Sequence, residues 1–577
     1  MTDLASAMPG ERRQLPAFRI EAETLALVLL VAFVTAMSIA PLARLVLAAL
    51  APQGALDLSH AWDVLARPKV FVAALNSLNV ALLSTLFAVV VGAFAAILTV
   101  HCNMRFKAAW VFGFVLPLMI PPQVTALAWV QAFSPTSPVL GLLGMALTPG
   151  SRHPLFSAWG IILLLGVYNA PLVFLTVRAA LHRVPANLSE AARAAGAGRS
   201  RVIWTILLPL ARSGILAGAA IAFVSAIGNF GIQAMLGIPA RFPTLITLIY
   251  QTLNGYGPAA LSDMALLSLL LALITVSGIA LASWLGRRGD LRVESLGRPA
   301  EIDLRGAKRW IEAGAWLYLI TTLLLPLSAL FATSLVKGFG QELTWTTVTL
   351  ANYASALLRQ ASIRDAFATS FVLTVTTVLI LSVISLFLAY FLSWRRGPVV
   401  RVLQMAAELS YVLPGIVLGV AMILFFLKPL PLVGVSIYGT VWIILVAYLS
   451  NFLALALRPL LGGFTQIDRS LEDAARIAGA GFLQRMRDIV MPLLAPAMVA
   501  GAIIVFMSAL NEIQVSILLV SSSARTIGPM IVFLEEGGSS TLAAAVGCLM
   551  VFIVLVLMSV ASLFSSRLPK GALPWLD

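Results

Sequence analysis

A small set of polar side chains interrupts the apolar stretches of this sequence, and their types limit the chemistry they can do. The set contains four amides and one carboxylate: Asn229, Gln233, Asn511, Glu512 and Gln514. Such groups can hydrogen-bond a polar solute or a neighbouring backbone, and inside an apolar span they are costly enough to suggest function. No nucleophile–base pair and no metal-ligand cluster accompanies them. The sequence therefore favours passage of a solute over catalysis, and it predicts neither a cofactor nor a metal site.

Glu512 is the only acid of this set, and its role has three open interpretations. It could line the path or its gate, where it would favour a cationic solute or make the gate depend on pH. It could instead pair with Arg525, or it could brace two helices. Glu408 is a weaker path candidate, because it lies near enough to one end of its span to reach Arg401.

The stretches that carry these side chains are long enough to cross a membrane. Hydrophobic residues make up 60% of the 577 residues and charged residues only 11%, and a helix needs about 20 apolar residues to span a bilayer. Because lipid does not tolerate unpaired backbone groups, we expect an all-α polytopic membrane protein. Twelve transmembrane helices are expected near residues 22–50, 71–100, 109–133, 157–181, 214–236, 261–285, 312–334, 366–394, 403–427, 438–460, 496–520 and 541–565.

The distribution of basic residues predicts the orientation of these helices. With this assignment of spans, 28 of the 38 lysines and arginines fall on one side, nine fall on the other, and Arg44 lies within the first span. Basic residues concentrate in cytoplasmic loops, so the richer side and both chain termini are expected in the cytoplasm. The positive charge then reflects membrane topology, and no nucleic-acid partner is expected.

The twelve spans divide into two similar halves in the same orientation. An even number of spans separates corresponding segments, which predicts a parallel repeat with a path between the halves. Pro121 in the third span matches Pro414 in the ninth, and we expect these prolines to break or kink both helices, for the path or for packing alone. The expected segments are a tail 1–21, a first domain 22–285, a linker 286–311, a second domain 312–565 and a tail 566–577.

Two polar loops, residues 182–213 and 461–495, repeat one pattern in register. In the first, Glu190-Ala191-Ala192 precedes Gly196 by three residues, and Ile206-Leu207-Leu208-Pro209 follows after nine more. In the second, Asp473-Ala474-Ala475, Gly479 and Ile489-Val490-Met491-Pro492 occupy the same places 283 positions later.

Each loop predicts a short helix, a glycine turn and a second short helix. Pro185 suits an early helical position and Asn187 a helix cap in the first copy, whereas Asp468 or Ser470 can cap the second. A left-handed turn that ends a helix suits glycine, and each copy offers two: Gly196 and Gly198, and Gly479 and Gly481. Amphipathic loops lying on the membrane surface are the alternative, but a matched register in both copies favours a docking element presented twice.

This pattern resembles the cytoplasmic signature of the permease subunits of type I ABC importers, and the resemblance covers both halves. It implies the type I importer permease fold, a bacterial inner-membrane location, two ATP-binding subunits on the cytoplasmic side and a periplasmic solute-binding protein. The implied ATPase-coupling residues are Glu190, Ala191, Ala192, Gly196, Asp473, Ala474, Ala475 and Gly479. The second copy departs at Asp473 and Met491, which puts the equivalence of the two loops in question. Among fused double permeases, a chain of this length most resembles those for ferric iron, 2-aminoethylphosphonate or thiamine.

Two other functions fit parts of the sequence. A secondary transporter can also have twelve spans in parallel halves, although that plan does not require the repeated loop. A membrane-embedded enzyme would need a catalytic constellation that is not apparent. The chain contains no G-x-x-x-x-G-K-[ST] phosphate-binding loop, so ATP hydrolysis is expected on separate subunits and the chain is not expected to be an enzyme.

Overall fold

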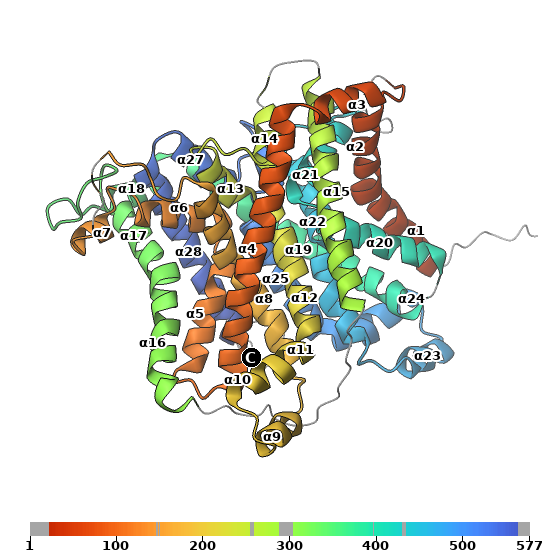
Figure 1. Ribbon diagram of the computed structural model, residues 1–577. Helices are drawn as coiled ribbons and strands as arrows, with labels where there is room; N and C mark the ends of the chain where they lie inside the picture. Colours follow the sequence, from red (N-terminus) through yellow and green to blue (C-terminus); the bar gives the residue numbers. More distant parts are fainter. Residues whose placement is uncertain are drawn as a thin grey trace, which may run out of the picture.

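The computed structural model contains helices joined by short loops, and no strand occurs in the residues it describes (Figure 1). These are residues 22–52, 54–145, 148, 150–253, 255, 259–287, 304–395, 397–429 and 434–563. The expected tails 1–21 and 566–577 and most of the expected linker lie outside the described residues. The domain boundaries stay a prediction.

The first half runs from α1 to α15. Its elements are α1 (Ala22–Val34), η1 (Thr35–Ile39), α2 (Ala40–Leu50), α3 (Leu58–Leu65), α4 (Pro68–His101), α5 (Lys107–Met119), α6 (Pro122–Ala132), α7 (Pro138–Leu142), α8 (Ala158–Leu181), α9 (Ala186–Ala194), α10 (Arg199–Val202), η2 (Ile203–Leu207), α11 (Leu208–Leu210), α12 (Arg212–Gly228), α13 (Phe230–Gly237), α14 (Leu245–Leu253) and α15 (Ala260–Arg287).

The second half repeats this order. Its elements are η3 (Arg305–Ala307), α16 (Lys308–Leu319), η4 (Ile320–Leu324), α17 (Leu325–Ser334), α18 (Ala351–Ala354), η5 (Ser355–Arg359), α19 (Ala361–Trp394), α20 (Pro398–Val412), α21 (Gly415–Phe426), α22 (Val441–Phe464), α23 (Ser470–Ile477), α24 (Phe482–Arg485), η6 (Met486–Val490), α25 (Met491–Leu510), α26 (Ser516–Leu519), α27 (Ile527–Glu536) and α28 (Ser540–Leu563).

The expected twelve spans are all found, but not all as straight helices. Within the described residues nine helices are long and apolar enough to cross a membrane, and up to twelve if each of three bent pairs counts as one span. The third and ninth expected spans are bent pairs: α5 and α6 meet at 107°, and α20 and α21 at 112°. Pro121 and Pro414 stand at the two breaks in extended conformation, since proline cannot continue the hydrogen bonding of the preceding helix. The expectation of a break at matched prolines is confirmed.

The fifth and eleventh spans also end earlier than their apolar patterns suggest. The helical axis turns by 67° at Ala211, between α11 and α12. At their other ends α12 stops at Gly228 and α25 stops at Leu510, well before the expected limits of 236 and 520. In each case a short helix follows after a non-helical residue or segment, because a side chain there caps the new helix, as described below.

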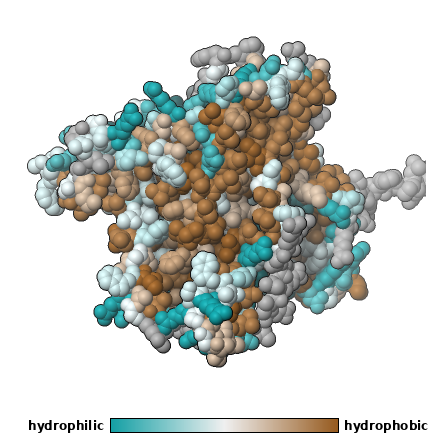
Figure 2. Space-filling view, viewed as in Figure 1, coloured by the Kyte–Doolittle hydropathy of each residue, from teal (hydrophilic) through white to brown (hydrophobic). Residues whose placement is uncertain are grey.

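The long helices bury small side chains against one another and turn large ones outward. Gly92 of α4 packs so closely on α8 that an added Cβ would lie 2.6 Å from the Ala170 carbonyl oxygen, an arrangement typical of helices packed in membranes. Large side chains of the same helix, Phe71 and Phe94, are 61% and 58% exposed. Large apolar areas of this kind dominate the middle of the molecular surface in Figure 2, as expected for a surface that faces lipid.

The first span of each half packs on the other half. α1 contacts α19, α20 and α24, and α2 contacts α21, so the N-terminal helix lies against the second half. In the same way α16 contacts α5, and α17 contacts α6 and α7. Figure 1 shows both arrangements, with red α1 beside α20 on one side and green α16 beside α5 on the other. The two halves are therefore interlocked.

π-helical turns recur at matched places, and two of them, η1 and η4, contact the opposite half. η1 and η4 lie 285 positions apart, and η2 and η6 lie 283 apart. In η4 the carbonyl of Thr322 accepts a hydrogen bond of 3.2 Å from the indole Nε1 of Trp129 in α6. In η1 the hydroxyl of Ser38 lies 3.2 Å from that of Ser450 in α22. A π-turn frees backbone groups from the helical ladder, and here the freed or neighbouring group bonds the opposite half.

Candidate functional site

The two repeated loops project from the same end of the molecule, which we call the loop end (Figure 1). In the first loop α9 ends at Ala194, and Gly196 follows with φ of +85°. In the second, α23 ends at Ile477, and Gly479 follows with φ of +86°. A residue with a side chain rarely adopts this conformation, so glycine is required for both turns.

The residues of the repeated pattern have the same exposure in both copies. Glu190 and Asp473 are exposed, as are Ala191 and Ala474, while Ala192 and Ala475 are partly buried. A Cβ added at Gly196 or Gly479 would meet nothing within 4 Å. Both loops therefore present small side chains and one acid to the exterior, on a surface that the rest of the described chain leaves open.

Two expectations about these loops are wrong: the helix cap at Asn187 and the left-handed turn at the second glycine of each pair. α9 begins at Ala186, one residue after Pro185, and no side chain caps it, so Asn187 lies inside the helix. Gly198 and Gly481 have φ of −67° and −65° and precede the next helices in extended conformation, so only the first glycine of each pair is left-handed. In the second loop Asp468 accepts a hydrogen bond from the Ser470 amide, as a capping aspartate would.

Behind each loop, a run of helix leads to the centre of the molecule, bent by 67° at Ala211 in the first half and unbroken in the second. In the first half the run passes through α10, η2 and α11 into α12, and in the second through α24 and η6 into α25. α12 ends at Gly228 and α25 at Leu510. The far ends of these runs hold the polar residues singled out in the sequence.

Asn229 and Glu512, which are 283 positions apart, have the same structural role in the two halves. The Asn229 Oδ1 accepts a hydrogen bond of 3.0 Å from the Ile232 amide at the start of α13. The two carboxylate oxygens of Glu512 accept hydrogen bonds from the amides of Val515 (2.5 Å) and Ser516 (3.1 Å) at the start of α26. Each side chain caps the helix that follows it.

This capping answers part of the question about Glu512. Both of its carboxylate oxygens are occupied by backbone amides, and none of the ion pairs found among the described residues joins Glu512 to Arg525. Arg525 instead lines a hollow with Asp365 near the start of α19. Glu408 is exposed and accepts a hydrogen bond of 3.3 Å from Gln404, and no ion pair to Arg401 occurs among the described residues.

The remaining polar residues tie the helix breaks together. The Asn511 amide donates a hydrogen bond of 2.8 Å to the carbonyl of Met119, which joins α25 of the second half to the end of α5 in the first. The Gln514 Oε1 accepts one of 3.2 Å from the Gly415 amide at the start of α21. Gln233 donates to the carbonyl of Ala226, near the end of α12.

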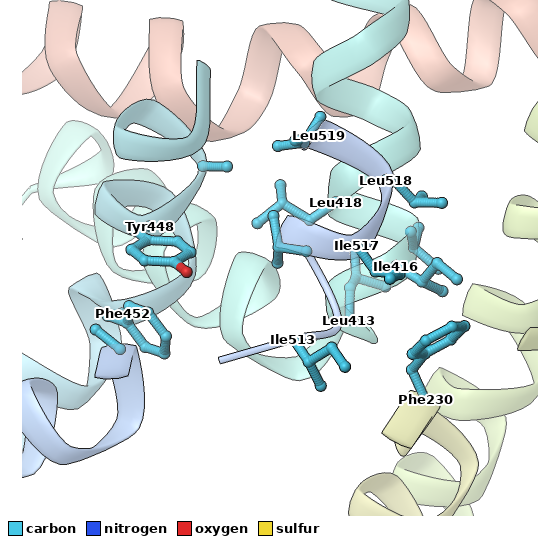
Figure 3. Close-up of a cluster of buried hydrophobic side chains, with 14 of the residues drawn as sticks. Phe230, Leu413, Ile416, Leu418, Tyr448, Phe452, Ile513, Ile517, Leu518 and Leu519 are labelled. Atoms are coloured by element: carbon cyan, nitrogen blue, oxygen red, sulfur yellow. The ribbon is translucent and has the colours of Figure 1, made fainter. Parts of the chain in front are cut away.

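The centre where these residues meet is packed shut. Gly228 of the first half lies close enough to Pro414 of the second that an added Cβ would be 3.4 Å from its Cβ. Figure 3 shows Phe230 of α13 beside Ile416 of α21, with Leu413 and Ile513 near them. All four side chains are buried. The structure therefore brings the candidate path residues to one closed centre at the two helix breaks.

Gln123 is a central residue that the sequence analysis did not single out. It follows Pro122 at the start of α6 and is fully buried, and neither amide atom of its side chain has a hydrogen-bond partner among the described residues. Its Nε2 would lie 3.3 Å from a Cβ placed on Gly528. The sequence could have indicated this residue, because Gln123, like Gln233, is a polar residue within an apolar span.

Comparison with known proteins gives a family match over both halves. The model of the family described as "Binding-protein-dependent transport system inner membrane component" matches residues 88–295 and 384–570. Both loops and both broken helix pairs lie inside these segments.

Individual relatives match either the whole chain or one half. A probable ABC transporter permease protein, y4fN of Sinorhizobium fredii, is 27% identical over 545 residues, which cover 92% of this chain and 94% of that protein. The ferric transport system permease protein FbpB of Actinobacillus pleuropneumoniae is 24% identical over 79% of this chain and 66% of its own length. The molybdenum transport system permease protein ModB of Escherichia coli is 34% identical over 37% of this chain and 93% of its own length.

Proposed function

Since this chain belongs to the family of binding-protein-dependent transport system inner membrane components and is an ABC importer permease, we propose that its two matched loops each dock one ATP-hydrolysing subunit. One observation carries the proposal. An acidic side chain, an alanine and a left-handed glycine are exposed at matching places 283 positions apart, at one end of the molecule. The alternatives of a secondary transporter and a membrane-embedded enzyme find no support in the family match.

The exposed face of each loop suits close approach by another protein. Alanine and glycine side chains let a partner surface reach the helix backbone, and the single acid at Glu190 or Asp473 offers one charged contact. On the second loop an open hollow of ≈ 300 Å³ is bounded in part by Ala475, Gly479 and Ile489. We assign the loop end to the cytoplasm, because most basic residues lie at that end, and the location to a bacterial inner membrane.

The helical runs behind the loops give docking a mechanical consequence. A helix is stiff along its axis, so a displacement of the second loop moves α25 and the cap at its central end, and a displacement of the first loop reaches α12 through the bend at Ala211. We propose rigid-body rocking of the two halves as the transport motion. In this mechanism the closed centre is the gate.

Opening this gate requires contacts between the halves to break. The hydrogen bond from Asn511 to the Met119 carbonyl joins the two halves directly, and it must be lost when they separate. Asn229 and Glu512 preserve the ends of α13 and α26 while the halves move, and Gln233 and Gln514 hold the adjoining backbone. We assign these five residues to the lining of the path in its open state.

For the cargo, we propose ferric iron delivered by a periplasmic binding protein. The relative with "ferric transport" in its name is similar over 79% of this chain, whereas the relative named for molybdenum is similar over 37%. A binding protein loaded with ferric iron should stimulate ATP hydrolysis by the reconstituted complex. Stimulation by a molybdate-loaded or 2-aminoethylphosphonate-loaded binding protein, and none by the ferric form, would replace this cargo with another.

A docking experiment tests the role of the loops. We expect Gly196→Asp together with Gly479→Asp to abolish binding of the ATPase subunits, because each aspartate would project from an exposed turn with nothing of its own chain within 4 Å. A matched control exists in Gly54→Asp with Gly538→Asp. These glycines also have positive φ and open surroundings, but they join α2 to α3 and α27 to α28, and α3 and α27 lie at the end opposite the loops in Figure 1. Retained ATPase binding in the loop variant, or equal loss in the control, would contradict the proposal.

A further inference from the structure

The second loop contains a buried ion pair that is not part of its exposed docking face. Glu472 lies on the inner side of α23 and Arg485 ends α24, and their side chains are only 5% and 7% exposed. The Arg485 Nε lies 2.9 Å from the Glu472 Oε1, and Arg485 also donates a hydrogen bond of 3.0 Å to the carbonyl of Ala480. Because Ala480 follows Gly479, the arginine fixes α23, the glycine turn and α24 relative to one another.

Further residues connect this pair to the membrane helices, and we call the whole set the loop clamp. The Tyr390 hydroxyl of α19 donates a hydrogen bond of 3.0 Å to Glu472. Glu23 of α1 lies 3.7 Å from Arg485 and 2.6 Å from Arg395, which follows α19. Glu23 comes from the first half of the chain, so the clamp joins the second loop to both halves.

An aromatic cluster encloses the clamp. Phe482 of α24 lies with its ring centroid 5.4 Å from that of Tyr390, and it also contacts Phe387 and Phe391 of α19. Trp394 packs on the other side of Tyr390 at 5.3 Å. Charge–charge attraction is stronger where water is excluded, and an uncompensated charge there is correspondingly costly.

The first loop has no such clamp at the matching positions. Glu472 and Arg485 correspond to Ser189 and Val202, both buried, at the offset of 283. Phe482 corresponds to Arg199 at the same offset, and Tyr390 to Ile97 at the offset of 293 that relates α19 to α4. Val202 belongs to a buried apolar cluster that includes Phe174 and Leu207, so an apolar contact stands where the second loop has its buried arginine.

We propose that the loop clamp makes the two coupling loops mechanically unequal, with Glu472 and Arg485 as positioning residues that transmit displacement of the second loop to α19 and α1. This inference rests on the proposed docking of ATPase subunits. A partner that moves α23 moves a unit locked by ion pairs to α1 and hence to both halves, whereas the matching positions of the first loop, Ser189 and Val202, carry no charge. The second loop is therefore the stiffer of the two.

Amide hydrogen exchange of the wild-type protein in nanodiscs tests the stiffness directly and requires no variant. We expect the amides of α23 to exchange more slowly than those of α9, although both helices are short and exposed on their outer faces. Equal exchange, or slower exchange in α9, would overturn the inference. This measurement does not depend on any ATPase partner.

Replacement of the ion pair by the residues of the first loop tests the coupling. The double variant Glu472→Ser with Arg485→Val removes both buried charges at once and leaves Glu23 paired with Arg395, so it avoids an uncompensated charge. We expect the ATP hydrolysed per cargo molecule to rise about fivefold, which corresponds to a coupling free energy at the low end of the usual range. Arg485→Lys keeps the charge and should restore most of the coupling.

The outcomes separate this inference from the proposed function. An unchanged ratio of ATP to cargo in the double variant refutes the clamp while leaving docking intact. Failure of the wild-type chain to bind any ATPase subunit refutes docking, and the exchange experiment then decides the stiffness alone. The matched change in the first loop, Ser189→Ala, should leave the ratio of ATP to cargo within about twofold of the wild type, and a fivefold rise there would refute the inequality of the two loops.

Discussion

Replacement of Glu512 by the residue that its counterpart uses distinguishes a structural carboxylate from one that contacts the cargo. Glu512 caps α26 through the amides of Val515 and Ser516, and Asn229 caps α13 through the amide of Ile232. Asparagine, the residue at the matching position of the first half, is therefore the neutral replacement to test at position 512. We expect Glu512→Asn to keep one of the two hydrogen bonds, and Glu512→Ala to lose both.

The hydrogen bonds set the expected magnitudes. Each bond to a charged acceptor contributes about 1.5–3 kcal/mol, and part of this is offset because the alanine variant no longer buries a carboxylate, so we expect a loss of about 2–4 kcal/mol for Glu512→Ala. Glu512→Asn loses only one of the two bonds and has the same offset, so it should cost about 1 kcal/mol. Asn229→Ala provides the matching loss in the first half, at about 1 kcal/mol.

The assays are thermal unfolding of the purified protein and cargo uptake by reconstituted vesicles. If Glu512 acts as a cap, stability and uptake should fall together, with Glu512→Asn close to the wild type and Glu512→Ala well below it. A variant Glu512→Asn that keeps its stability and loses uptake would show that the negative charge acts on the cargo. That result would refute the structural role assigned to Glu512.

Two further substitutions probe the closed centre. Gly528→Ala would place a Cβ 2.6 Å from the carbonyl oxygen of Glu512, so we expect a loss of about 1–3 kcal/mol in thermal stability; Gly141→Ala, which meets nothing within 4 Å, is the control, and equal effects would contradict the packing described. Asn511→Ala removes the hydrogen bond to the Met119 carbonyl between the halves, so we expect the open state to gain about 1 kcal/mol and cargo-independent ATP hydrolysis to rise about fivefold. Unchanged hydrolysis would mean that this bond does not restrain opening.

Features that depend on local sequence were predictable. The number of spans and the places of the two glycine turns follow from apolar length and from residue type, and Gly196 and Gly479 have the expected left-handed conformation. The matched prolines indicated a disturbed helix, and the bends of 107° and 112° confirm it. The angle itself could not be predicted, because proline can either kink a helix or end it, and packing decides between them.

Features that depend on distant contacts were not predictable from one sequence. The packing of α1 on the second half, and the approach of Glu23 to Arg485, join residues far apart in the chain without any periodic signal. The cap formed by Glu512 was missed for a different reason. Its position within an apolar pattern suggested a continued helix, while the hydrogen-bonding side chain ends one helix and starts another.

The most direct test of the account is the stoichiometry of the purified complex by native mass spectrometry. A chain with two docking loops should be found as one copy with two ATPase subunits, and the variant Gly479→Asp should retain one. A complex with two copies of this chain, or one in which the single variant loses both ATPase subunits or neither, would contradict the assignment of one docking site to each loop.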